Sequence, residues 1–388
     1  MFIPYSCQQI TDEDIAAVTA VLRSEYLTQG PAVAAFEQAF AVRHQVAHAV
    51  AVSNATAALH IGCLALGVGP DSRVWTTPNT FLASANCARY CGAAVDFVDI
   101  DPVTRNISPA ELARKLEAAE AKGALPSVVI PVDFAGLPCD MREIRLLADR
   151  YGFKILQDAS HAAGATYLDR PVGSAWADLT VFSFHAVKVV TTAEGGLLAT
   201  QDAALAEKLR LLRSHGMTRD PAQMEQAPEG PWYYEQQVLG FNYRLTDVQA
   251  ALGTSQLARI DTMGVQRDAL AQRYDRLLAG LPLRLPARKA DRKSAWHLYA
   301  VEIDAQRTSA RRVDVFKQLR AAGLGVNVHY IPVHLQPYYA RWGFRRGDFP
   351  AAEGYYDQAL SIPLFPALTH AQQDQVVHLL GQALQDCA

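Results

Sequence analysis

A lysine follows a strand-like run of residues in a setting that disfavours a charged amine. Residues 178–184, DLTVFSF, are apolar and β-branched, which is typical of a buried strand. The chain continues as HAVKVVTTAEGG, so Lys188 comes a few residues after that strand ends. Burying a charged amine costs free energy, so this lysine is either solvated or has a chemical role. A neutral lysine amine is a nucleophile that can form a Schiff base with a carbonyl group.

Three other stretches lie at strand ends or turns where a ligand could bind. Asp158 ends the apolar stretch ILQD, where its carboxylate either needs a cationic partner or caps the following helix. The turn SNATAAL, residues 53–59, leads into a helix whose first amides favour a phosphate, unless it is an ordinary N-cap. In TTPNTFLASAN, residues 76–86, Phe81 is either part of the core or a flat surface for stacking.

Together, these four features are the parts needed to hold pyridoxal 5′-phosphate. The helix N-terminus would bind the phosphate, and the aromatic face would cover the ring. The carboxylate of Asp158 would keep the pyridine nitrogen protonated, so that the ring withdraws electrons. Lys188 would form the Schiff base and would move a proton between substrate and cofactor. The sequence therefore predicts Lys188 and Asp158 as the catalytic residues of a pyridoxal-phosphate enzyme.

The elements that must position these residues alternate between strands and helices. Seven short apolar stretches predict strands: VAHAVAV, RVWTT, AAVDFVDI, SVVIPVD, FKILQD, DLTVFSF and GGLLAT. Helical stretches lie between them at 56–66, 81–91, 108–121 and 141–151. This alternation predicts an α/β fold with a mostly parallel central sheet flanked by helices. In such a sheet the ligand binds outside the carboxyl ends of the strands.

After residue 200 the pattern changes. Residues 218–240 are rich in proline, glutamate and aromatic residues and predict a long surface loop, after which a long helix is expected from Thr246 to about residue 280. HLYAVEI, a helix at 309–322, GVNVHY and a helix at 369–386 predict a smaller α+β domain. We therefore expect an N-terminal segment that contributes to the substrate site (1–30), a large cofactor-binding domain (31–255) and a small C-terminal domain (256–388).

The composition argues against several classes of protein. The chain has 388 residues and a net charge of −3, without a basic run that would predict a nucleic-acid surface. No apolar run approaches the ~18 residues of a membrane span, and the first residues lack the pattern of a secretory signal. The six cysteines are scattered, and Cys87 and Cys91 lack the second cluster that a zinc site needs. We expect a cytoplasmic protein with reduced cysteines and no metal, nucleic-acid or membrane partner.

The motifs NATAAL, TTPNTF, QDASHA, SFHAVKVVTTAEGG and GFNYRLTD, in this order, resemble those of the DegT/DnrJ/EryC1/StrS sugar aminotransferases. The resemblance covers essentially the whole chain and implies the fold type I architecture of pyridoxal-phosphate-dependent transferases. LTQGP, RSHGM, HLY and VHYIPVH are most similar to one branch, the aminotransferases of pseudaminic acid biosynthesis. That likeness implies amino transfer, usually from L-glutamate, to C4 of a UDP-4-keto-6-deoxy-N-acetylhexosamine, namely UDP-2-acetamido-2,6-dideoxy-β-L-arabino-hex-4-ulose.

The resemblance also implies roles for other residues. Besides Lys188 and Asp158, the cofactor would contact Ala55, Thr56, Phe81, His161, Ser183 and Asn242. Asn242 would reach in from a second subunit, which implies a homodimer with shared active sites. The nucleotide sugar would contact Tyr5, Glu25, Tyr26, Leu27, Thr28, Asn327, Val328, His329 and Tyr330. Gln157 stands where many relatives carry Glu, a change that we expect to be harmless.

Three alternatives remain open at this point. A related class removes a 3-hydroxyl group and carries histidine in place of the lysine, and Lys188 argues against it. A non-catalytic sensor or regulator would carry an added DNA-binding module, for which the chain has neither the length nor a basic recognition helix. An aminotransferase for another nucleotide keto-sugar, either 3-keto or D-configured 4-keto, would have the same cofactor site.

Overall fold

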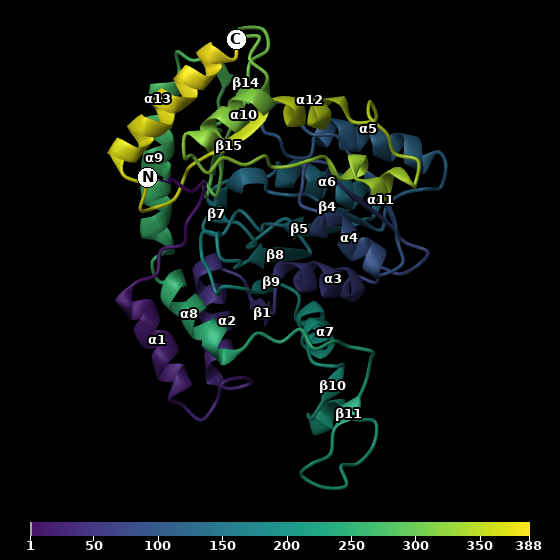
Figure 1. Cartoon of the computed structure of the whole chain (residues 1–388). Coiled ribbons are helices and arrows are strands. Elements are labelled where there is room, and N and C mark those ends of the chain that lie inside the picture. Colours follow the sequence, from purple (N-terminus) through teal and green to yellow (C-terminus); the bar gives the residue numbers. More distant parts are fainter. Residues whose placement is uncertain (1) are drawn as a thin grey trace.

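The computed structural model describes residues 2–388, and its centre is a seven-stranded sheet (Figure 1). The strands lie in the order β1-β9-β8-β5-β4-β2-β3. Their bounds are β1 (His48–Val52), β2 (Arg73–Thr76), β3 (Ala94–Phe97), β4 (Val128–Ile130), β5 (Lys154–Asp158), β8 (Leu179–Ser183) and β9 (Gly196–Thr200). Strand β9 runs antiparallel to both neighbours, whereas the pairs from β8 to β3 are parallel. The mostly parallel α/β architecture expected from the sequence is confirmed.

Helices cover both faces of this sheet. One face is covered by α3 (Ala55–Ala65), α4 (Ala83–Tyr90) and α7 (Ala203–Arg213). The other is covered by α2 (Pro31–His44), α5 (Pro109–Glu120), α6 (Met141–Tyr151) and α8 (Asp247–Leu257). Neighbouring residues of a strand point to opposite faces, so Val181 packs in the first core and Phe182 in the second. Burial on both faces explains why the strands are continuous apolar runs.

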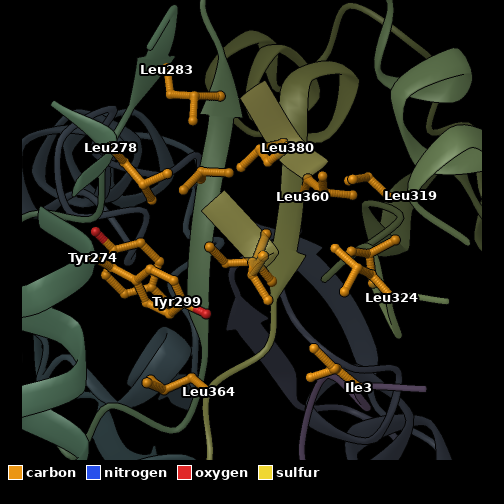
Figure 2. Packing of buried hydrophobic residues seen from close by; sticks show 14 of the residues in the cluster. Ile3, Tyr274, Leu278, Leu283, Tyr299, Leu319, Leu324, Leu360, Leu364 and Leu380 are labelled. Carbon is orange, nitrogen blue, oxygen red and sulfur yellow. The ribbon is translucent and has the colours of Figure 1, made fainter. Parts of the chain in front are cut away.

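A smaller domain packs around the sheet β12-β14-β15. Its strands are β12 (Leu283–Arg284), β14 (Tyr299–Ile303) and β15 (Ala359–Ile362), and its helices include α9 (Ile260–Leu278), α10 (Arg312–Ala321) and α13 (His370–Asp386). Figure 2 shows the core of this domain, to which Ile3 from the start of the chain contributes a fully buried side chain. The start of the expected N-terminal segment thus packs against the small domain through Ile3. The expected division at residues 30 and 255 stays a prediction.

Two details of the expected secondary structure are wrong. GVNVHY, residues 325–330, forms no strand, and only a single backbone bridge joins Asn327 to Ser361. The long helix expected from Thr246 is two helices, because Arg259, with φ −106° and ψ 6°, separates α8 from α9. The Arg259 guanidinium lies 2.6 Å from the carboxylate of Asp14, which is completely buried and also accepts a hydrogen bond from Ser255 at 2.6 Å. The break thus lies where the chain turns toward Asp14 of α1 (Asp12–Leu22).

The loop expected at 218–240 projects from the body of the molecule (Figure 1). It contains the short hairpin of β10 (Met217–Thr218) and β11 (Glu235–Gln236), and its Trp232 and Leu239 are 70% and 80% exposed. The remaining elements are β6 (Thr166–Tyr167), β7 (Arg170–Pro171), β13 (Arg292–Lys293), α11 (Pro337–Ala340), α12 (Pro350–Gln358) and the 3₁₀ turns Phe134–Gly136, Pro221–Gln223 and Val333–Leu335. Across residues 2–388, no helix has the length and apolar character needed to cross a bilayer.

Candidate active site

Lys188 lies in the turn that follows β8, where its backbone N–H donates to the carbonyl of His185 at 2.9 Å. Its side chain is half-buried. Loss of water around the amine lowers the pKa of Lys188 to about 8, although the nearby charge of Asp158 works in the opposite direction. A lysine with this pKa is partly neutral near pH 7–8, so it can act as a nucleophile and as a base.

Asp158 ends β5 with a side chain that is only 5% exposed. One carboxylate oxygen accepts a hydrogen bond from the Ser84 hydroxyl at 2.6 Å, and the other accepts from the Ser160 backbone N–H at 3.1 Å. No arginine or lysine of the described chain forms an ion pair with it, and the bond to Ser160 is the cap-like contact that the sequence left open. Two hydrogen bonds leave accepting capacity on the carboxylate for a cationic ligand.

The start of α3 and the facing end of β8 form a cradle for an anion. The Asn54 side chain accepts from the Ala57 N–H at 2.8 Å, which leaves the N–H groups of Ala55 and Thr56 free of partners within the helix. Gly196 pairs with Ser183 across the sheet, and a Cβ on Gly196 would lie 2.4 Å from the Asn54 carbonyl carbon. The sheet therefore approaches the N-terminus of α3 closely at Gly196, and Ser183 is the residue paired with Gly196 on the next strand.

The hydrogen bonds of His161 define its tautomer. Its Nδ1 accepts from the Ala135 backbone N–H at 3.2 Å, so the ring proton is on Nε2, which donates to the Tyr330 hydroxyl at 3.1 Å. Burial and the neighbouring Lys188 charge lower the pKa of His161 well below its ordinary value, so the ring is neutral. The Tyr330 hydroxyl therefore accepts from His161 and keeps its own proton free to donate to a ligand.

Residues of the small domain and the N-terminal segment complete one wall of the site. His329 Nδ1 lies 2.8 Å from the Ser361 hydroxyl, and its Nε2 lies 3.4 Å from the Asn327 amide nitrogen. The Tyr5 ring is 5.6 Å from that of His329, between centroids. Burial and the charge of Lys188 lower the pKa of His329 to about 4. The wall is polar but uncharged at neutral pH.

Phe81 lies at the mouth of the site, with its ring 6.3 Å from that of Tyr330 between centroids and 58% exposed. It is therefore not a core residue, and an exposed aromatic face here can cover a ring bound above Asp158. Val328, whose backbone N–H donates to the Asn327 side chain, is half-buried beside the same wall.

Two sets of residues predicted to bind the substrate or the cofactor do not contact Lys188 of the same chain. Glu25, Tyr26, Leu27 and Thr28 are all exposed. The carbonyl of Leu27 accepts from the Asp247 N–H at 3.0 Å, which ties this segment to the start of α8. Asn242 is also exposed, and its backbone pairs with Ser214. Among the contacts of the described residues, none joins either group to Lys188 of the same chain.

Three residues that support the site were not predicted. Ser84 lies in the stretch TTPNTFLASAN, in the first turn of α4. It follows Thr80 by four positions, a spacing that brings the two hydroxyls to 2.8 Å and could have indicated its role. Ser361 lies on β15 and gave no local signal. His297 of the HLY motif is buried with its ring 4.5 Å from that of His161 between centroids.

Gln157, which replaces the Glu of many relatives, points away from Asp158 because the two are successive residues of β5. Its amide donates to the Asp133 carboxylate at 2.8 Å. Burial, together with the charge of Asp158, raises the pKa of Asp133 to about 7. A neutral amide beside Asp133 avoids placing a third carboxylate in this region, which agrees with the expectation that the change is harmless.

Comparison with known proteins identifies the class. A sequence profile of the DegT/DnrJ/EryC1/StrS aminotransferase family matches residues 8–381. The chain is 41% identical over 379 residues to the spore coat polysaccharide biosynthesis protein SpsC of Bacillus subtilis (strain 168), covering 97% of this chain and 95% of SpsC. Among solved structures it is similar to Helicobacter pylori PseC, an aminotransferase involved in the biosynthesis of pseudoaminic acid, with a TM-score of 0.91, 30% identity and 100% of both chains covered.

The structure is also similar to Spr1654 of Streptococcus pneumoniae, solved in PLP and PMP forms, with TM-scores of 0.88 and 0.89, 28% identity and 100% of both chains covered. The chain belongs to the DegT/DnrJ/EryC1/StrS aminotransferase family. It is a pyridoxal-phosphate-dependent sugar aminotransferase with the fold type I architecture, which excludes the sensor alternative.

The residues in place fit this cofactor. The free amides of Ala55 and Thr56 suit its phosphate, and the buried Asp158 carboxylate suits a protonated ring nitrogen. When bound, pyridoxal phosphate supplies a carbonyl carbon and an electron-withdrawing ring for amino transfer. Asp158 would hold the ring nitrogen in its protonated form, and the Lys188 amine would accept and return the proton that moves during the reaction.

The lowered pKa of Lys188 predicts its reactivity in the cofactor-free protein. Acylation of the Lys188 side chain, followed by peptide mass spectrometry across a pH series, should show a midpoint near pH 8. An ordinary lysine has a pKa of about 10.4. In Asp158→Asn the midpoint should fall further, because the negative charge that supports the ammonium form is gone. A wild-type midpoint near that of an ordinary lysine would contradict the desolvated site.

If Asp158 supports the cofactor, its replacement lowers kcat, whereas a residue that only caps the next helix could be replaced without this effect. Asp158→Asn keeps the shape and can still accept from Ser160, but it removes the charge opposite the ring nitrogen. We expect kcat to fall by at least ~10²-fold, as for other preorganised electrostatic partners. Asp133→Asn is the matched control, a buried carboxyl whose side chain accepts from Gln157 and the Cys139 N–H and not from Ser84 or Ser160, and its kcat should stay much closer to wild type. Equal effects in the two variants would contradict the assignment.

Proposed function

We propose that this enzyme transfers an amino group from L-glutamate to C4 of UDP-2-acetamido-2,6-dideoxy-β-L-arabino-hex-4-ulose in pseudaminic acid biosynthesis. The observation that carries the proposal is the full-length similarity to PseC, with a TM-score of 0.91 over 100% of both chains. Two motifs of the C-terminal half of the sequence, HLY and VHYIPVH, supply His297, His329 and Tyr330 to the wall beside Lys188.

The chemistry of that wall supports a neutral, hydroxyl-rich substrate. Tyr5, Asn327, His329 and Tyr330 offer donors and acceptors without charge, which suits the hydroxyl and acetamido groups of a sugar. The Tyr330 hydroxyl is held by His161 with its proton free, so it can donate to an oxygen near the reacting carbon. Lys188, with its pKa of about 8, would move the proton.

Product analysis tests the choice of sugar. Purified enzyme is given L-glutamate with each of two UDP-4-keto-6-deoxy-N-acetylhexosamines, the β-L-arabino compound and its D-configured epimer. We expect mass spectrometry to show the amino sugar from the β-L-arabino compound, with 2-oxoglutarate formed in equal amount. The Lys188→Ala variant is the control for uncatalysed amination and should give no product. Amination of the D-configured epimer alone would overturn the proposed substrate but leave the aminotransferase class intact.

A second candidate is an aminotransferase for another nucleotide keto-sugar. The 41% identity with SpsC, a protein of spore coat polysaccharide biosynthesis, favours it, since this value exceeds the 30% identity with PseC. Both candidates have the same cofactor site, so the two-epimer assay separates the first from the D-configured 4-keto form of the second.

We also propose that two copies of the chain share their active sites. The predicted residues Glu25–Thr28 and Asn242 lie away from Lys188 of their own chain: the first segment is tied to the start of α8, and Asn242 pairs with Ser214 at the end of α7. Tyr26 and Leu27 are 52% and 51% exposed, and Trp232 and Leu239 of the projecting loop are more so. These exposed apolar side chains would be buried by a second copy, which would bring Asn242 to the partner's cofactor phosphate.

Mixing two inactive variants tests whether the site is shared. Asn242→Ala should lose about 1.5–3 kcal/mol of a charge-assisted phosphate contact, and Lys188→Ala should be inactive. In a mixed dimer, Lys188 of the first chain meets the intact Asn242 of the second, so activity should return. Random reassembly should give about a quarter of wild-type activity, since half of the dimers are mixed and each has one intact site.

The matched control mixes Lys188→Ala with Asp158→Asn. Both residues serve the same chain, so no mixed dimer has an intact site and activity should not return. If the Asn242→Ala mixture also stays inactive, although native mass spectrometry shows that mixed dimers form, Asn242 does not act across the interface.

A further inference from the structure

A tight turn between β4 and α6 contacts the imidazole of His161. Residues Phe134–Gly136 form a 3₁₀ turn in which Ala135 has φ 58° and ψ 3°, a left-handed conformation that residues other than glycine seldom adopt. The Ala135 N–H donates to His161 Nδ1 at 3.2 Å. A residue keeps such a conformation only where its surroundings impose it, and positions of this kind cluster at functional sites.

The side chain of Asn106 bridges the two ends of this turn. Its Oδ1 accepts from the Phe134 N–H at 2.9 Å, and its Nδ2 donates to the Leu137 carbonyl at 2.9 Å. Asn106 is only 1% exposed, so water does not compete for either hydrogen bond. Because an amide side chain carries both an acceptor and a donor, this one residue can satisfy both ends of the turn and hold it closed.

The turn is also packed tightly against the backbone of the site. A Cβ on Gly136 would lie 2.9 Å from the His161 carbonyl oxygen and 3.1 Å from the His297 backbone nitrogen, so glycine is the residue that fits here. The Gly136 carbonyl accepts from the Ala295 N–H at 3.0 Å. The turn therefore lies between the backbones of the two histidines, and its conformation determines where the Ala135 amide points.

We propose that Asn106 is a positioning residue that selects the tautomer of His161 and thereby leaves the hydroxyl proton of Tyr330 for the substrate. A backbone N–H only donates, so the His161 Nδ1 that accepts from Ala135 carries no proton, and the ring proton lies on Nε2. Nε2 then donates to the Tyr330 hydroxyl at 3.1 Å. The inference rests on the proposed role of Tyr330 as a donor near the reacting carbon.

Loss of the amide contact would remove this selection. With the proton on Nδ1, His161 Nε2 would accept from the Tyr330 hydroxyl, and the hydroxyl proton would be used within the protein. Burial, together with the charge of Asp158, raises the pKa of Tyr330 above its ordinary value, so this hydroxyl stays protonated at neutral pH. The tautomer of His161 therefore decides whether Tyr330 donates to the substrate or only accepts from it.

The tautomer can be measured by ¹⁵N NMR of the enzyme labelled in its histidine rings, in the holoenzyme and again without the cofactor. The His161 signals are assigned by their loss in His161→Gln. We expect the Nε2–H form alone in the wild type and a mixture of the two neutral tautomers in Asn106→Ala. Gln373→Ala is the matched control, a fully buried amide that donates to the Leu270 carbonyl at 3.0 Å in the small domain, and its His161 signals should match the wild type. The Nε2–H form alone in folded Asn106→Ala would overturn the proposal.

A double-mutant cycle tests the link to Tyr330. Asn106→Ala should lower kcat by about 5-fold, the equivalent of one ordinary hydrogen bond. The same substitution in a Tyr330→Phe background should change kcat little further, because the hydroxyl that His161 orients is already gone. Equal fold losses in the two backgrounds would show that Asn106 does not act through Tyr330. Gln373→Ala should keep its kcat in both backgrounds.

Two further measurements separate this inference from folding and from the choice of substrate. Asn106→Ser keeps a hydroxyl near one end of the turn but cannot bridge both, so it should show the same tautomer mixture if Asn106→Ala does not fold. The NMR measurement needs no substrate and therefore holds for any nucleotide sugar. If Tyr330→Phe keeps its full kcat while Asn106→Ala mixes the tautomers, the catalytic role of Tyr330 is overturned and the selection of the His161 tautomer by Asn106 is supported.

Discussion

A buried carboxylate without an ion-pair partner in its own chain governs the organisation of this site. Asp158 is only 5% exposed at the end of β5, where a charge that lacks compensation is strongly destabilising. The chain provides two hydrogen bonds, from Ser84 on α4 and from the Ser160 backbone, and it places the Lys188 amine close enough for the two charges to interact. Asp158 thus connects α4, through Ser84, with the turn after β8 that carries Lys188. A protonated ring nitrogen of the cofactor would complete the compensation.

The surroundings of Lys188 are polar but avoid positive charge. His161 and His329 are both held neutral by burial and by the lysine itself. A cationic imidazole next to Lys188 would stabilise its neutral form further but would also repel the ring nitrogen's proton. Neutral rings can still orient a hydroxyl, as His161 does for Tyr330, because one nitrogen accepts from Ala135 and the other donates. Hydrogen bonds therefore orient the side chains of the site, and Lys188 and Asp158 carry its charges.

Local sequence was sufficient wherever burial alone determined the structure. The seven strands were predictable because burial on both faces demands apolar runs, and Lys188 and Asp158 stood out because they end or follow such runs.

Residues that depend on distant contacts were not predictable. GVNVHY has the composition of a strand, but it forms only the single bridge of Asn327 with Ser361 and a hydrogen bond from Gly325 to Ile3. The break at Arg259 lies where this residue pairs with Asp14, 245 positions away. Ser361 reaches His329 only through the pairing of separate segments of the small domain. The placement of Glu25–Thr28 and Asn242 away from Lys188 of the same chain has no signal in one sequence.

The way residues 3–6 are held has a consequence for the order in which the protein matures. Ile3 is the first residue of a core completed by Leu380 and Leu384, and its backbone exchanges hydrogen bonds with Gly323 and Gly325. Ser6 then donates to the carbonyl of Val187, directly before Lys188. Residues 3–6 can therefore take their final places only after the segment that carries Leu380 and Leu384 has been synthesised. The large domain can fold while translation continues, but the wall that contains Tyr5 can form only after α13 has been made.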